Sequence, residues 1–212
     1  MLFRESRSIL GRLFCFPEPD LPFVVYECIN RNMTEPIATM PALGMMTTNR
    51  GRTVEEASHQ SAVLLVFLRH FGCTFCREAL EDLSRKQDTF KADGIHMVFV
   101  HMADDQAADE YFAKYNIHDP EHVADPGCLY YAMFGLGKGK FSQLFGLQVM
   151  MRGFEAGVLK GHGIGRQIGD GFQMPGVFLI QNGVVRDQFI HHLASDRPDY
   201  DNLVSCCTIP LV

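Results

Sequence analysis

The stretch AVLLVFLRHFGCTFCREAL, residues 62–80, decides how the rest of the chain is interpreted. Residues 62–68 are all apolar, and this run is too short for a membrane span. A strand with one solvent-exposed face would alternate apolar and polar residues, so the uniform run predicts a strand buried on both faces. Beyond Cys73 the apolar spacing changes to that of an amphipathic helix that starts near Thr74. The polar side of this helix is predicted to carry Glu78, Glu81, Asp82 and Arg85. Cys73 and Cys76 therefore lie where a buried strand leads into a helix.

The position of these two cysteines predicts their chemistry. The first turn of a helix has unpaired N–H groups and a partial positive charge, and both favour an anion. A thiolate is such an anion, and Arg69 and His70 add positive charge, so we expect a cysteine pKa below the usual value of about 8.5. Because Cys73 and Cys76 are one helical turn apart, they can close a disulfide and reopen it. A CxxC pair at a strand-to-helix junction indicates redox chemistry more strongly than zinc binding.

Composition limits the class of protein. The chain has 212 residues, of which 47% are hydrophobic and 21% are charged, as in an ordinary globular protein. Its net charge of −6 argues against a nucleic-acid partner, and no apolar run approaches the ~18 residues of a membrane span. Seven scattered cysteines, with no secretory signal, predict a reducing, cytoplasmic location. No residue pattern indicates a cofactor or a resident metal.

Residues 1–44 are predicted to form an N-terminal extension, and residues 45–212 the main domain. The extension begins with a short amphipathic helix in residues 1–16, which either packs on protein or touches a membrane surface. Turn residues in the segment 47–54 predict a small hairpin before the core.

A second strand and helix follow the cysteine helix, which is expected to stop at Asp93-Gly94. Residues 96–102, HMVFVHM, predict another buried strand. Asp104 or Asp105 can cap a helix over residues 106–115. Strand–helix units in succession imply parallel strands with right-handed crossovers.

The middle of the chain is less regular. Residues 116–126 are polar, and we expect His118 and His122 to be solvated loop residues rather than metal ligands. A short helix containing Cys128 is predicted over residues 127–134, and a longer helix with a broad apolar surface over residues 141–154.

The segment GVLKGHGIGRQIGDG, residues 157–171, is rich in glycine. Its spacing fits neither the P-loop nor the dinucleotide fingerprint, so we expect a loop bordering a site, with His162 and Arg166 as substrate contacts. A homodimer formed through this loop and residues 141–154 is an open alternative.

The C-terminal part contains a clear hairpin signal. Asn182-Gly183 separates the apolar runs 176–180 and 184–190, which predicts two antiparallel strands. Pro175 cannot donate to a sheet ladder and is therefore placed at the start of the first strand, with a cis peptide bond. A last helix is expected over residues 198–206.

This order of elements resembles the thioredoxin fold over roughly residues 45–207. More closely, LVFLRHFGCTFCRE at residues 65–78 and VADP at residues 123–126 are similar to the peroxiredoxin-like AhpC/TSA family, which includes relatives of selenoprotein L. The resemblance implies an α/β thioredoxin-like fold: a central mixed sheet flanked by helices, with an N-terminal extension and a helical, glycine-rich insertion before the cis-proline strand.

The resemblance also implies an activity. It points to an antioxidant oxidoreductase that reduces peroxides or disulfides through a redox-active Cys73–Cys76 disulfide, recycled by thioredoxin or a similar dithiol. Arg69, Met174 and Pro175 are implied as substrate-binding residues. The resemblance to thioredoxin favours Cys73 as the attacking thiol and the peroxiredoxin alignment favours Cys76, so that choice stays open.

Three alternatives remain at this point. The wider family includes members that reduce endoperoxides of the prostaglandin type. The second alternative is a non-enzymatic thioredoxin-like binding module. The third is a zinc site formed by Cys73, Cys76 and the pair Cys206-Cys207.

Overall fold

A five-stranded mixed sheet forms the centre of the computed structural model, which describes residues 40–140, 169–205 and 207. The strand order is β3-β2-β1-β4-β5. The strands are β1 (Ala62–Phe67), β2 (Ile95–His101), β3 (Glu121–Ala124), β4 (Gly176–Gln181) and β5 (Val184–Ile190). β2 runs parallel to both β1 and β3, whereas β4 runs antiparallel to both β1 and β5. The sheet is mixed, as the predicted fold class requires.

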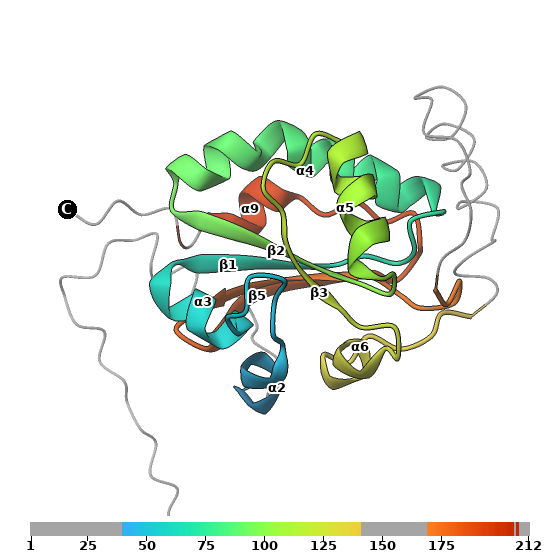
Figure 1. Cartoon of the computed structure of the whole chain (residues 1–212), viewed down its shortest axis with the longest axis horizontal. Coiled ribbons are helices and arrows are strands. Elements are labelled where there is room, and N and C mark those ends of the chain that lie inside the picture. The colour runs from blue at the N-terminus through green and yellow to red at the C-terminus, as the bar shows by residue number, and fades with distance from the viewer. Residues whose placement is uncertain (1–39, 141–168, 206, 208–212) are drawn as a thin grey trace, which may run out of the picture. The chain divides into compact units, whose positions relative to one another are not determined.

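Helices cover both faces of this sheet (Figure 1). The helices are α2 (Met40–Met45), α3 (Val54–Gln60), α4 (Thr74–Ala92), α5 (Asp105–Lys114), α6 (Leu129–Met133) and α9 (Tyr200–Val204). One face carries α4, α5 and α9, and the opposite face carries α2, α3 and α6. No helix within the described ranges is long and apolar enough to cross a membrane.

The central strand β1 is buried on both faces, as its sequence predicts. Leu64 and Val66 belong to the apolar cluster under α4, and Val63 and Leu65 belong to the cluster on the opposite face. Because side chains alternate along a strand, an unbroken apolar run supplies both clusters. β1 is therefore a rigid base for the residues that follow it.

The predicted limits of α4 and the hairpin are confirmed, whereas α6 and α9 are shorter than predicted and Cys128 precedes α6 as its N-cap residue. α4 begins at Thr74 directly after Cys73 and ends at Ala92. The Asp104 side chain caps α5 by accepting a hydrogen bond from the amide of Ala107. In the turn between β4 and β5, Asn182 and Gly183 have φ values of 53° and 71°, as a type I′ turn requires.

The N-terminal side of the core begins in α2. Ala42 and Leu43 are buried in the same cluster as Val63 of β1. Thr47 and Thr53 form the bridge of the small predicted hairpin, and Thr53 then caps α3. The domain boundary between residues 44 and 45 stays a prediction.

Two predictions of local structure are wrong. None of the peptide bonds between described residues is cis, so Pro175 opens β4 from a trans bond. The polar segment 116–126, predicted as a solvated loop, contains β3, because Glu121 and His122 find buried partners across the fold. The helix predicted over residues 141–154, His162 and Arg166 all lie outside the described residues, and a dimer contact there stays a prediction.

Candidate active site

The Cys73–Cys76 pair lies at the junction of β1 and α4. Cys73 has extended backbone angles and is the N-cap residue of α4, and Cys76 lies in the first turn of that helix. Both side chains are buried, with 6% of Cys73 and 5% of Cys76 exposed. Both thiols are free, so the pair is in its reduced form. The helix start therefore places two sulfur atoms in surroundings where amide groups and burial together control their ionisation.

Arg69 supplies hydrogen bonds to both sulfur atoms. Its guanidinium Nη1 lies 3.3 Å from Sγ of Cys73, and its backbone amide lies 3.2 Å from Sγ of Cys76. Its Nη2 donates to the carbonyl of Gly171. Arg69 is buried, and within the described part of the chain its Nε has no hydrogen-bond partner. One buried cation thus faces the sulfur atoms and keeps one donor available.

The two thiols have different acidities. A hydrogen bond from Cys76, the Arg69 charge and the nearby amides of Cys76 and Phe75 outweigh burial and lower the pKa of Cys73 to about 6. Cys76 is the donor of this hydrogen bond, and both the hydrogen bond and burial raise the pKa of Cys76 well above its ordinary value. These opposite shifts favour the thiolate at Cys73 over the thiolate at Cys76.

His70 does not contribute to this effect, which corrects the sequence analysis. Burial and the neighbouring charge of Arg69 lower the pKa of His70 to about 4. The ring is therefore neutral at physiological pH, and the positive charge beside Cys73 comes from Arg69.

A narrow pocket opens beside the sulfur atoms. It has about 30 Å³ of solvent-accessible space, enough for one or two water-sized groups. Its lining includes Arg69, Cys73, Cys76, Pro175, His191 and Tyr200. Met174 does not line the pocket but packs with Ala194, Phe75 and Leu193 beside it. The structure thus places Arg69 and Pro175 in the pocket with the cysteines, and Met174 beside that pocket.

Several pocket residues were missed by the sequence analysis. Glu78 and Asp82, predicted on the solvated side of α4, are buried. Asp82 accepts two hydrogen bonds from Arg197, which lies 115 residues further along the chain. No local pattern could indicate that pair. His191 was also missed, and burial lowers its pKa to about 4, so it faces the pocket as a neutral ring.

The zinc alternative finds no support at this site. Within the residues that the structure describes, no third histidine, cysteine or carboxylate comes within metal-binding distance of the Cys73–Cys76 pair. Cys207 lies elsewhere, with its sulfur 3.7 Å from the side-chain oxygen of Gln181. Cys206 lies outside the described residues.

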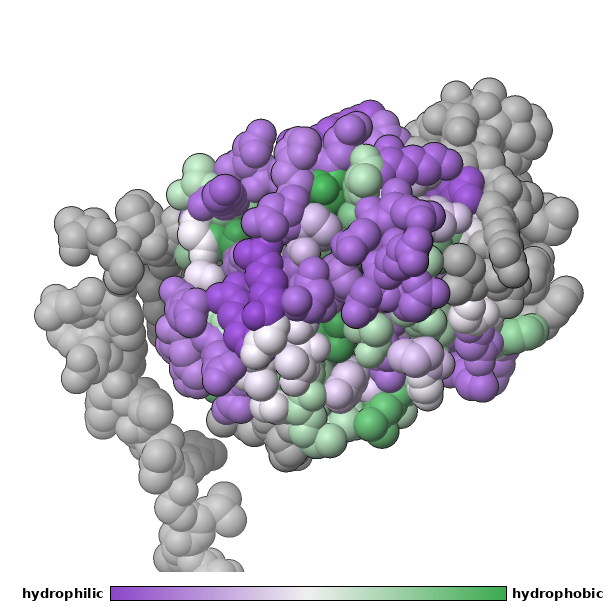
Figure 2. Space-filling view, viewed as in Figure 1, coloured by the Kyte–Doolittle hydropathy of each residue, from purple (hydrophilic) through white to green (hydrophobic). Residues whose placement is uncertain are grey.

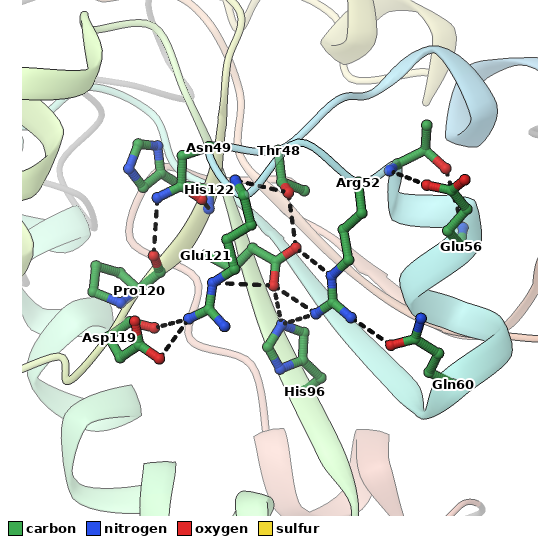
Figure 3. A network of polar contacts seen from close by, with 12 residues as sticks. Thr48, Asn49, Arg52, Glu56, Gln60, His96, Asp119, Pro120, Glu121 and His122 are labelled. Atoms are coloured by element: carbon green, nitrogen blue, oxygen red, sulfur yellow. Dashed lines mark hydrogen bonds and ion pairs between the residues drawn. The ribbon is translucent and has the colours of Figure 1, made fainter.

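A polar network at the edge strand β3 was likewise missed. Figure 3 shows the carboxylate of Glu121 held by Arg52, Thr48 and His96. Burial opposes its ionisation, but these hydrogen bonds outweigh burial and lower the pKa of Glu121 to about 2. The ring of His122 lies away from that carboxylate, since neighbouring residues of a strand point to opposite faces.

Comparison with known proteins gives one family and a set of similar folds. The family model described as AhpC/TSA antioxidant enzyme matches residues 82–192, just over half of the 212-residue chain. The match begins after Cys76, so it does not include the two cysteines. No curated protein sequence is a significant match.

Several of the similar solved structures are peroxiredoxins. A cysteine-to-serine mutant of peroxiredoxin 6 from Arenicola marina has a TM-score of 0.55 at 9% identity, over 76% of this chain and 67% of that one. Peroxidoxin BcpB from Mycobacterium tuberculosis has a TM-score of 0.53 at 13% identity, over 76% and 89%. Reduced Prx3 from Vibrio vulnificus, in complex with H2O2, has a TM-score of 0.51 at 18% identity, over 73% and 86%. At such identities the likeness shows the fold.

Proposed function

Because the chain belongs to the AhpC/TSA antioxidant enzyme family, we propose that it is a thiol oxidoreductase that reduces peroxides or disulfides through Cys73 and Cys76. The observation that carries this proposal is the asymmetry of the pair. Arg69 donates to Cys73 Sγ and the pKa of Cys73 is lowered, whereas that of Cys76 is raised. An activated thiolate beside a protonated thiol is the arrangement that a two-cysteine reduction needs.

The first step is attack by the Cys73 thiolate on a peroxide. The sulfur displaces the distal alkoxide or hydroxide, so Cys73 becomes a sulfenic acid and the leaving oxygen takes a proton to form an alcohol or water. The Nε of Arg69, which has no hydrogen-bond partner among the described residues, is a buried donor that can bind a peroxide oxygen beside the reacting sulfur. Its charge also stabilises the anion that leaves.

The second step closes the disulfide. Cys76, which is held near Cys73 in the first turn of α4, attacks the sulfenic sulfur and water leaves. An external dithiol such as thioredoxin then reduces the Cys73–Cys76 bond through a mixed disulfide and supplies two electrons. With a disulfide substrate, Cys73 forms the mixed disulfide directly and Cys76 resolves it. The scattered cysteines suit a reducing cytosol, where the pair rests as a dithiol.

The pocket favours a small peroxide over a bulky substrate. Its solvent-accessible space of about 30 Å³ accommodates hydrogen peroxide or the head of a small hydroperoxide. Pro175 and His191 line it together with residues of α4. We therefore expect hydrogen peroxide to react faster than a hydroperoxide with a branched aromatic group.

A coupled assay tests this proposal. Consumption of NADPH is followed with thioredoxin and thioredoxin reductase, using hydrogen peroxide in one series and a protein disulfide in another. We expect turnover to be lost in Cys73→Ser and Cys76→Ser. Cys128→Ser serves as a matched control, because Cys128 lies outside the pocket and burial raises the pKa of its thiol. Full turnover by a variant lacking both Cys73 and Cys76 would exclude the scheme.

A further inference from the structure

Two buried histidines meet between the neighbouring parallel strands β2 and β3, outside the lining of the cysteine pocket. His101 is the last residue of β2, and His122 is the second residue of the neighbouring strand β3. Each ring is buried, with 1% of either residue exposed. Nε2 of His101 lies 2.9 Å from Nδ1 of His122. The proposed redox reaction uses neither ring.

The other nitrogen of each ring is already oriented by an acceptor. Nδ1 of His101 lies 3.1 Å from the carbonyl of Ala103, and Nε2 of His122 lies 3.2 Å from Oδ1 of Asp109. A carbonyl or carboxylate oxygen can only accept a hydrogen bond, so the ring nitrogen that faces it must carry a proton. The two nitrogens that face each other are then both lone-pair acceptors in neutral rings. Such a contact needs a positive charge between or beside the two nitrogens, either an extra proton or a metal ion.

The surrounding geometry favours a metal ion. Ligating histidines almost always donate their second N–H to a carbonyl or a carboxylate, as both rings do here. A third ligand stands beside them, because Oδ1 of Asp105 lies 3.7 Å from Nδ1 of His122. The ligand atoms of His101, Asp105 and His122 all lie within 4.8 Å of one another. Around tetrahedral zinc, with bonds of about 2.0–2.1 Å, ligand atoms are about 3.3 Å apart, between the separations seen here.

We propose that His101, His122 and Asp105 form a site for a divalent metal ion, with Zn²⁺ as the ion that their chemistry suits. Two imidazole nitrogens and one carboxylate oxygen are ligands that zinc accepts, and a water molecule completes its coordination. The side chains of Asp105 and Asp109, which contact the buried ring of His122, are 66% and 61% exposed and so reach solvent. Figure 2 shows a hydrophilic surface over α5, the helix that carries both carboxylates. Bound metal would fasten α5 to the strands β2 and β3.

Zinc titration of metal-free protein tests the site. The Cys73→Ser/Cys76→Ser protein is used, so that the CxxC thiols cannot take the metal, and Zn²⁺ is added in a calorimeter after dialysis against a chelator. We expect one equivalent to bind and the thermal unfolding midpoint to rise. Asp105→Asn should weaken binding by at least about ten-fold, and Asp109→Asn by about ten- to a hundred-fold. Both side chains are exposed, so neither change disturbs the core.

A matched control and a second metal complete the experiment. Glu110→Gln removes the same charge from the exposed side of α5 without touching the histidines, and it should bind zinc as the parent protein does. Co²⁺ reports the ligands, because thiolate ligation adds a near-ultraviolet charge-transfer band that a histidine–carboxylate site lacks. Failure to take up Zn²⁺, a strong thiolate band, or equal affinities in Asp105→Asn and Glu110→Gln would each overturn the proposal, leaving a shared proton between the rings.

Discussion

Glu121 offers a prediction whose size follows from the structure. Its carboxylate is fully buried in the network of Figure 3, where Arg52 binds both of its oxygens and Thr48 and His96 add hydrogen bonds. Glu121→Gln keeps the shape of the side chain and removes its charge. The variant therefore measures what the ionised carboxylate contributes to folding.

The expected loss is about 3 kcal/mol. The network lowers the pKa of Glu121 from its ordinary value of 4.5 to about 2. A shift of about 2.5 units, at about 1.36 kcal/mol per unit, gives a contribution of about 3 kcal/mol at neutral pH. Because the folded state has the lower pKa, this contribution is complete above about pH 5 and is lost as the pH falls toward 2.

Urea unfolding at several pH values checks this prediction. We expect Glu121→Gln to be less stable than the parent at pH 7 by about 3 kcal/mol, and the difference to shrink steadily below about pH 5. Asp119→Asn is the matched control, because the Arg50–Asp119 ion pair is exposed and should contribute less than about 1 kcal/mol. If the two variants lose equal stability, or if the Glu121→Gln difference does not depend on pH, the reasoning about this network is refuted.

Two further predictions concern the cysteine pocket. Arg69→Met removes the cation beside Cys73 and should raise the pKa of that thiol by about one to two units, measured by the pH dependence of alkylation. The rate at neutral pH is a poor readout, because a more basic thiolate is intrinsically more nucleophilic and offsets its lower population; an unchanged pH midpoint would contradict the role of Arg69. Cys76→Ser should leave Cys73 as a sulfenic acid after one equivalent of peroxide, which dimedone labelling and mass spectrometry detect. Labelling of another cysteine instead would assign the attack elsewhere.

Local patterns in the sequence were sufficient to predict most of the sheet. The apolar run before Cys73 predicted the buried strand β1, the change of period after it predicted α4, and Asn182-Gly183 predicted the hairpin. Each of these signals depends on residues close together in the chain. The same local reasoning placed Cys73 and Cys76 at a helix start, and the structure places them there.

The misses concern pairs that are far apart in sequence. The sequence predicts Asp82 on the solvated side of a helix, because its partner Arg197 is distant in the chain. It likewise predicts His122 in a solvated loop, because its partner His101 belongs to another strand. Burying a polar group is costly without a partner, so a sequence pattern alone predicts exposure. The neutral state of His70 could not be read from sequence either, because it depends on burial beside Arg69.

The acidities of the two thiols decide whether Cys73 is the activated cysteine of the pair. Each cysteine of the intact protein is alkylated across a pH series, and the rates at Cys73 and Cys76 are read separately by mass spectrometry. We expect a midpoint near pH 6 for Cys73 and a midpoint above that of an ordinary thiol for Cys76. Equal midpoints, or a lower midpoint at Cys76, would show that Cys73 is not the activated thiol.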